Sequence, residues 1–129
     1  MILEAALLCL ALNIFHEARG ETILGQYAVA QVTMNRAGWD QSRVCKVVYA
    51  SRQFSWTHQP ARHRKPSRVD PESWEKAQVI ARVTLERPGL MNVLVKDADH
   101  YHATYVRPKW RKGMTRTARI GRHIFYYST

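Results

Sequence analysis

A single glutamate, Glu17, stands where the pattern of the chain calls for an apolar residue. Before it, apolar residues recur at steps of four, three and four positions, at Leu3, Leu7, Leu10 and Ile14. This is the spacing of one face of an α-helix, and Glu17 continues that face by three. A carboxyl at the end of a buried face loses water, which raises its pKa. The pattern therefore indicates a general acid, and it fits equally a glutamate that only caps or pairs with the next helix.

Glu21 is the second acid of this stretch. It lies four residues after Glu17, but Gly20 stands between them, and glycine commonly ends a helix. We therefore expect Glu21 to begin the next element, near a helix N-terminus that favours negative charge. Arg19 is the nearest cation in sequence, and it either pairs with one of the two carboxylates or lies in solvent.

The histidines offer a weaker case for chemistry. His100 and His102 lie two apart in a segment rich in β formers, so they face the same side of a predicted strand. With His58 or His63 they would make a metal site. No Cys or Asp pair stands at ligand spacing nearby, and no glycine-rich phosphate loop or zinc-finger spacing occurs. We expect no metal and no cofactor.

Length and charge narrow the class of protein. At 129 residues we expect one domain, spanning residues 1–129, and the hydrophobic fraction of 46% is enough for a packed core. Twenty Lys and Arg against ten Asp and Glu give a formal net charge of +10. Such a protein associates with anionic polymers, and nucleic acid, anionic lipid and bacterial cell wall are all candidates.

Two cysteines, Cys9 and Cys45, are too few for a disulfide framework. Both lie among apolar residues, so each is expected to be a separate core side chain, which suits a reducing compartment without excluding an oxidising one. The apolar stretch 2–15 carries an acid near its start and no basic residue, unlike a signal peptide, and it is too short to span a bilayer. We expect it to be the first core helix.

The order of the elements predicts an α+β fold, mainly helical with a small C-terminal antiparallel β-sheet. A second helix is expected over roughly residues 26–37 and a shorter one over 42–49. A third begins with Asp70 as N-cap and Pro71 as its first residue and runs to Pro88. Residues 57–70 read as an exposed basic loop. A strand at 100–106 and a hairpin over 117–127, turning at Gly121 and Arg122, complete the chain.

The segment 53–56 has the composition of a sugar-binding surface. Phe54 and Trp56 offer aromatic faces that stack on pyranose rings, and Gln53 and Ser55 offer groups that bond sugar hydroxyls. The alternative is a pair of aromatics that closes a small core, which is the commoner fate of a residue such as Phe54.

Several of these stretches together resemble the SleB-type cell-wall hydrolases, a spore-cortex-lytic family also found among bacteriophage lysis enzymes. Residues 15–21 (FHEARGE) with 25–36 (GQYAVAQVTMNR) look like the first signature of that family. Residues 53–56 (QFSW) look like the second, and 100–110 with 120–126 (IGRHIFY) resemble the C-terminal segment. The likeness covers roughly residues 3–60 and 98–127, whereas residues 62–99 carry no matching signature.

The resemblance implies a lysozyme-like fold and an enzyme that cleaves the peptidoglycan glycan between N-acetylmuramic acid and N-acetylglucosamine, as a lytic transglycosylase or a muramidase. The catalytic glutamate then falls on Glu17. Substrate-binding positions carried over from the signatures are Glu21, Gln53, Phe54, Ser55, Trp56, His100 and Tyr101. A hydrolase using two carboxylates would need a second acid across the bond, and a transglycosylase would not.

The expected partners are peptidoglycan glycan strands and the anionic wall surface, and the protein is expected to be a monomer that binds no nucleic acid. The basic loop at 57–70 is the first candidate for wall docking, followed by Lys109, Arg111 and Lys112. With no signal peptide in view, a phage endolysin made in the host cytoplasm and acting on the wall after release fits best. The alternative is a basic nucleic-acid-binding module or a wall-binding protein without catalysis.

Overall fold

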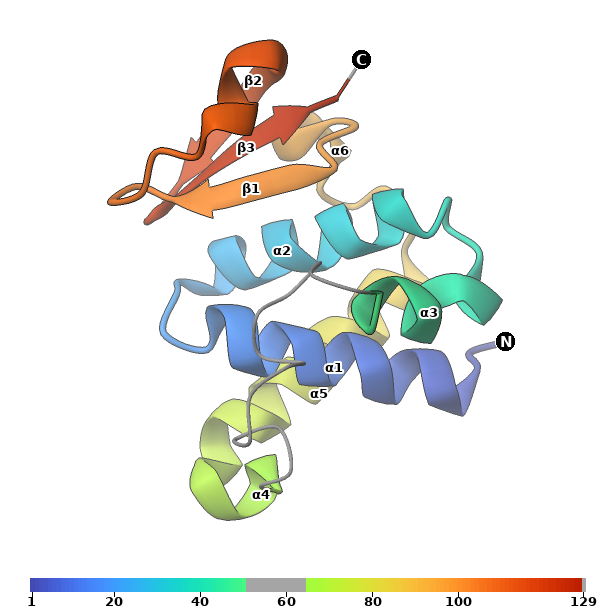
Figure 1. Cartoon of the computed structure of the whole chain (residues 1–129). Coiled ribbons are helices and arrows are strands. Elements are labelled where there is room, and N and C mark those ends of the chain that lie inside the picture. The colour runs from blue at the N-terminus through green and yellow to red at the C-terminus, as the bar shows by residue number, and fades with distance from the viewer. Residues whose placement is uncertain (51–64, 129) are drawn as a thin grey trace.

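The structure, a computed structural model, describes residues 1–50 and 65–128 (Figure 1). Helices come first and a three-stranded sheet last, as the α+β prediction requires. The elements in chain order are α1 (Glu4–Ala18), α2 (Ile23–Arg36), η1 (Gln41–Arg43), α3 (Val44–Val48), α4 (Pro66–Val69), α5 (Pro71–Glu86), α6 (Asn92–Val95), β1 (His100–Ala103), η4 (Lys109–Gly113), β2 (Thr115–Ile120) and β3 (His123–Tyr127).

Helix α1 forms the centre of the helical layer, in contact with α2, α3 and α5 (Figure 1). Its buried face includes Leu10, Ile14 and Phe15, each at most 1% exposed. The helix ends at Ala18, two residues before Gly20, as the spacing predicted. Asn13 is also buried and donates to the Thr33 hydroxyl at 3.2 Å, which gives this polar group of α1 a partner on α2.

Helix α2 lies between α1 and the sheet (Figure 1). It begins three residues earlier than predicted, because the Thr22 hydroxyl accepts from the Gly25 backbone N–H at 3.1 Å and caps the helix there. Ala28, Ala30 and Val32 are fully buried. These small side chains allow the helix to be covered closely on two sides.

Helix α5 begins as predicted, with the Asp70 carboxylate accepting from the Ser73 backbone N–H at 3.1 Å and Pro71 as first residue. Ala77, Ala81 and Leu85 are buried, whereas Val79 is 55% exposed. The loop prediction for 57–70 is wrong for its last part, since Pro66 starts the short helix α4. Proline fits there because the first turn of a helix needs no donor from that residue. No helix within residues 1–50 and 65–128 is long and apolar enough to cross a membrane.

The sheet is antiparallel in the order β1-β3-β2, so β3 pairs with both neighbours. Its inner face carries Phe125, Ile120 and Ala118, which form a hydrophobic cluster with residues of α2 and α6. The β2–β3 turn contains Gly121 at φ +58°, a left-handed conformation that glycine adopts without strain. A β-bulge between Arg116 and Ala118 interrupts the register of β2 against β3.

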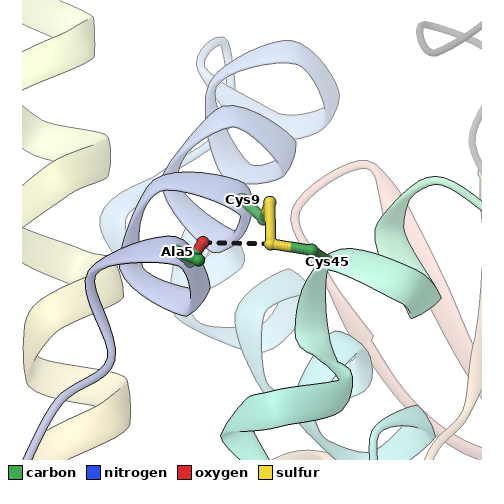
Figure 2. The surroundings of a disulfide bond; sticks show 3 residues. All are labelled: Ala5, Cys9 and Cys45. Carbon is green, nitrogen blue, oxygen red and sulfur yellow. Dashed lines mark hydrogen bonds between the residues drawn. A yellow bond between two sulfur atoms is a disulfide. The ribbon is translucent and has the colours of Figure 1, made fainter.

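The prediction of two separate core cysteines is wrong. Cys9 on α1 and Cys45 on α3 form a disulfide, with their Cα atoms 5.2 Å apart (Figure 2). That separation lies within the range a disulfide bridges, and it arises because α3 packs directly on α1. The Cys45 sulfur also lies 3.1 Å from the Ala5 carbonyl oxygen, the acceptor to which a reduced Cys45 thiol would donate.

Candidate active site

Glu17 lies in the last turn of α1, half-buried, facing the inner side of the sheet. The Tyr101 hydroxyl on β1 donates to Glu17 Oε1 at 2.6 Å. Tyr101 pairs with Phe125 in the sheet and therefore shares its inner face. The contact joins residues 84 positions apart and fixes one carboxylate oxygen. A carboxyl group keeps its proton on one oxygen while the other accepts a hydrogen bond, so the contact with Tyr101 is compatible with a protonated Glu17.

Burial raises the pKa of Glu17 above its ordinary value, and the Tyr101 hydrogen bond and the Arg36 charge oppose that rise. The net direction keeps a proton on the carboxyl at a higher pH than a solvent-exposed glutamate would allow. Burial, followed by the neighbouring Glu17 charge, pushes the pKa of Tyr101 well above its ordinary value. Tyr101 therefore remains a hydrogen-bond donor across the physiological range. The site has the electrostatic character of a general acid.

Arg36 is the member of this site that the sequence analysis did not single out. It ends α2, is half-buried, and its charge acts on both Glu17 and Tyr101. Its Nε donates to the Asp99 backbone carbonyl at 2.5 Å, which ties the end of α2 to the start of β1. The signal was present in the sequence, because Arg36 continues the apolar face of α2 four residues after Val32, as Glu17 continues that of α1.

Glu21 is bound by the β2–β3 turn. Its carboxylate accepts from the Arg122 backbone N–H at 3.0 Å and from the Arg122 guanidinium at 2.9 Å. His123 Nδ1 lies 3.6 Å from the same carboxylate, whose side chain is only 7% exposed. Glu21 thus anchors the turn to the α1–α2 connection. Arg19, the other charge considered with it, lies over the Phe15 ring at 4.4 Å.

His100 and His102 share one side of β1, as predicted, and it is the outer face of the sheet. Trp110 of η4 packs against both, with ring centroids 5.2 and 5.7 Å apart. His100 Nδ1 contacts the Asp99 carboxylate at 2.9 Å, and His102 Nε2 contacts the Tyr126 hydroxyl at 2.9 Å. Within residues 1–50 and 65–128, no group of three or more His, Cys, Asp or Glu is arranged to hold a metal.

An open hollow of about 410 Å³ borders this site and is large enough for part of a sugar. Its lining comes from α2, α3 and the start of β1, through Asn35, Arg36, Val47, Ala50, Asp99 and His100. His100 is thus beside the hollow, where a substrate-binding residue is expected, whereas Tyr101 points to Glu17 on the opposite face. The predicted sugar-binding residues Gln53, Phe54, Ser55 and Trp56 lie outside the described part of the chain, as do His58 and His63.

We predict that Tyr101→Phe moves to higher pH any activity that requires a protonated Glu17. The tyrosine hydroxyl stabilises the charged carboxylate and so lowers the pKa of Glu17. Its loss raises that pKa further, so the protonated acid persists and the high-pH limb of kcat/KM shifts upward. The turnover number falls about tenfold, because Glu17 loses its fixed orientation.

The pH profile of kcat/KM tests this prediction. Tyr105→Phe is the matched control, because Tyr105 is 82% exposed and should leave the profile unchanged. A high-pH limb that stays in place, or moves down, in Tyr101→Phe would show that the hydroxyl does not set the protonation of Glu17.

Comparison with known proteins identifies the family to which this chain belongs. The family described as Cell Wall Hydrolase matches residues 20–126, most of the chain, and the protein belongs to that family. The matched range begins three residues after Glu17. No match was found among curated protein sequences.

Two solved structures share the fold. The catalytic domain of the Bacillus cereus SleB protein is 23% identical over 98% of this chain and 93% of its own, with a TM-score of 0.74. The catalytic domain of the germination-specific lytic transglycosylase SleB from Bacillus anthracis is 24% identical over 97% of this chain and 96% of its own, with a TM-score of 0.68. The lysozyme-like α+β fold and the SleB-type family predicted from the sequence are both confirmed.

Proposed function

We propose that this protein cleaves the glycan strands of peptidoglycan between N-acetylmuramic acid and N-acetylglucosamine, with Glu17 as the acid. The observation that carries the proposal is the state of Glu17: half-buried, with a raised pKa, and held at one oxygen by Tyr101. Membership of the Cell Wall Hydrolase family supplies the substrate class. The SleB likeness, to a protein described as a lytic transglycosylase, supports the same reaction class.

In the proposed reaction the Glu17 carboxyl gives its proton to the glycosidic oxygen as the bond to the muramyl anomeric carbon breaks. The leaving N-acetylglucosamine departs with a free hydroxyl, and Glu17 becomes a carboxylate. The C6 hydroxyl of the same muramyl residue then attacks the anomeric carbon. Its proton passes to the Glu17 carboxylate, which restores the acid and leaves a 1,6-anhydro end. No water is consumed.

The distribution of the other acids supports transglycosylation over hydrolysis. Residues 51–64 contain no Asp or Glu, so a second carboxylate must come from the described residues. Glu21 is engaged with Arg122. Asp99 lines the hollow, but its carboxylate already accepts from the Ser128 backbone N–H at 2.9 Å and contacts His100. An Asp99→Asn variant that still forms anhydro ends at the wild-type rate would show that Asp99 is not a second catalytic carboxylate.

The loss of turbidity of purified peptidoglycan separates this function from its alternatives. We expect the protein to clear the suspension, whereas a nucleic-acid-binding or wall-binding module leaves it intact. The masses of the released fragments then separate the two reactions, because a hydrolysed end carries one water more than an anhydro end. An intact wall after prolonged incubation would contradict the proposal, and fragments with only reducing ends would replace the transglycosylase by a muramidase.

A further inference from the structure

We infer that the outer face of the β-sheet is a docking surface for the peptide carboxylates of peptidoglycan, separate from the site around Glu17. This inference rests on the proposed function for the identity of the polymer. The surface, named here the sheet face, comprises the outward residues of β2 and the exposed cations of the β1–β2 connection. These are Arg107, Lys109, Lys112, Arg116 and Arg119.

The charge of this part of the chain is one-sided. Residues 100–129 contain seven Lys and Arg and no Asp or Glu, so most of the formal charge of +10 comes from the last quarter of the sequence. The five cations of the sheet face are exposed. Within residues 1–50 and 65–128, Arg122 alone of the seven forms an ion pair, with Glu21. The five cations of the sheet face therefore form no ion pair with a carboxylate within residues 1–50 and 65–128.

The β-bulge at Thr117 is what brings two arginines onto this face. In a regular strand Arg116 and Arg119, three residues apart, would point to opposite sides. Here Arg116 lies opposite Tyr126 and Arg119 opposite Ile124, and these two β3 residues share one side of the sheet. The bulge inserts one extra residue between them and turns both arginines outward. Without it, one of the two would point into the apolar cluster around Phe125.

A rigid aromatic layer supports the cations. Trp110 packs against Tyr126 with ring centroids 5.5 Å apart, and His102 stacks on Tyr126 at 5.2 Å. Lys109 comes directly before Trp110 and Lys112 two residues after it, on the same short helix, η4. The aromatic contacts fix η4 on the sheet. The backbone that bears these lysines therefore loses less conformational entropy on binding than a loop would. Trp110 itself remains 38% exposed.

Two acids lie at the margin of the sheet face. Asp99 contacts His100 Nδ1 at 2.9 Å. Asp97 lines a hollow of about 190 Å³ together with Lys96 and Arg116, so a second cation stands beside it and the local balance remains positive. The peptides of peptidoglycan carry carboxylates, and the unpaired positive charge of the sheet face is complementary to them. Tyr101, which holds Glu17, is on the inner side of the strand whose outer side carries His100 and His102. Peptides bound on the outer face of the sheet would then belong to glycan strands next to the glycan strand that is cleaved at Glu17.

Co-sedimentation with purified peptidoglycan tests the inference. The protein carries Glu17→Gln so that the wall stays intact, and phosphate-bearing polymers are removed from the wall beforehand. Arg116→Glu with Arg119→Glu should weaken binding by about tenfold or more at low salt, because two exposed contacts become repulsive. Lys76→Glu with Arg82→Glu, which makes the same charge change on exposed positions of α5, is the matched control and should weaken it less than about threefold. The difference should shrink as salt rises.

Chemical variants of the wall identify the anion. Amidation of the peptide carboxylates should abolish the difference between the two double variants, whereas walls that keep their phosphate polymers should bind no more tightly through the sheet face. Equal binding by both double variants would overturn the inference. So would a difference that depends on phosphate, or a sheet-face effect seen only with DNA. Because binding is measured without turnover, a wall that is bound but never cleaved by the active protein would refute the proposed function and leave the docking surface standing.

Discussion

Replacing Glu17 by Gln should lower the rate of peptidoglycan lysis by about 10²- to 10⁴-fold, the usual contribution of a general acid. Glutamine has the same size, and its side-chain oxygen can still accept from the Tyr101 hydroxyl, 2.6 Å from Glu17 Oε1. The fold should therefore persist, with the melting temperature unchanged or slightly raised, because a half-buried ionisable group is removed. The measurement is the initial rate of turbidity loss, with circular dichroism to establish folding.

Glu21→Gln is the matched control for that experiment. It makes the same chemical change four residues away, in a carboxylate that anchors the β2–β3 turn through Arg122. We expect a lower melting temperature and a smaller loss of rate than for Glu17→Gln. Lysis at the wild-type rate by folded Glu17→Gln would remove Glu17 as the acid, and equal losses from both variants would argue against its separate role.

Loss of the Cys9–Cys45 disulfide should lower the free energy of unfolding by about 2–4 kcal/mol, because the bond closes a loop between residues 36 apart. For a chain of this size that corresponds to a fall in melting temperature on the order of 10 °C. Glu17 lies about two turns along α1 from Cys9, so the rate of lysis well below the melting temperature should be nearly unchanged.

Thermal unfolding with and without reductant measures this effect. The double variant Cys9→Ala with Cys45→Ala should melt near the temperature of the reduced wild type and should not respond to reductant. Two titratable thiols in the native, unreduced protein, or a melting temperature that reductant does not alter, would show that the bond does not form or does not stabilise the fold.

Local patterns predicted the elements that carry the site because those patterns act over a few residues. The apolar period placed Glu17 at the end of α1, and the Asp70–Pro71 pair marked the start of α5. Glycine at position 121 marked the hairpin turn. Each of these features is decided by backbone geometry and capping within one or two turns of chain. It can therefore be predicted from the sequence without knowing which elements pack together.

The contacts that complete the site are tertiary and left no comparable signal. The hydrogen bond from Tyr101 to Glu17 joins residues 84 positions apart, and it depends on which side of β1 faces the helices. The disulfide required α3 to pack on α1 at the level of Cys9. The bulge that turns Arg116 outward follows from the pairing of β2 with β3 rather than from either strand alone.

The chemical nature of the new ends made in purified peptidoglycan tests the central claim most directly, that Glu17 drives cleavage of the glycan strand. Wild type should create new muramyl ends and no new peptide amino groups, and folded Glu17→Gln should create neither above background. New peptide amino groups without new muramyl ends would contradict the claim, since the protein would then cut the peptides. Muramyl ends formed by Glu17→Gln at the wild-type rate would contradict it as well.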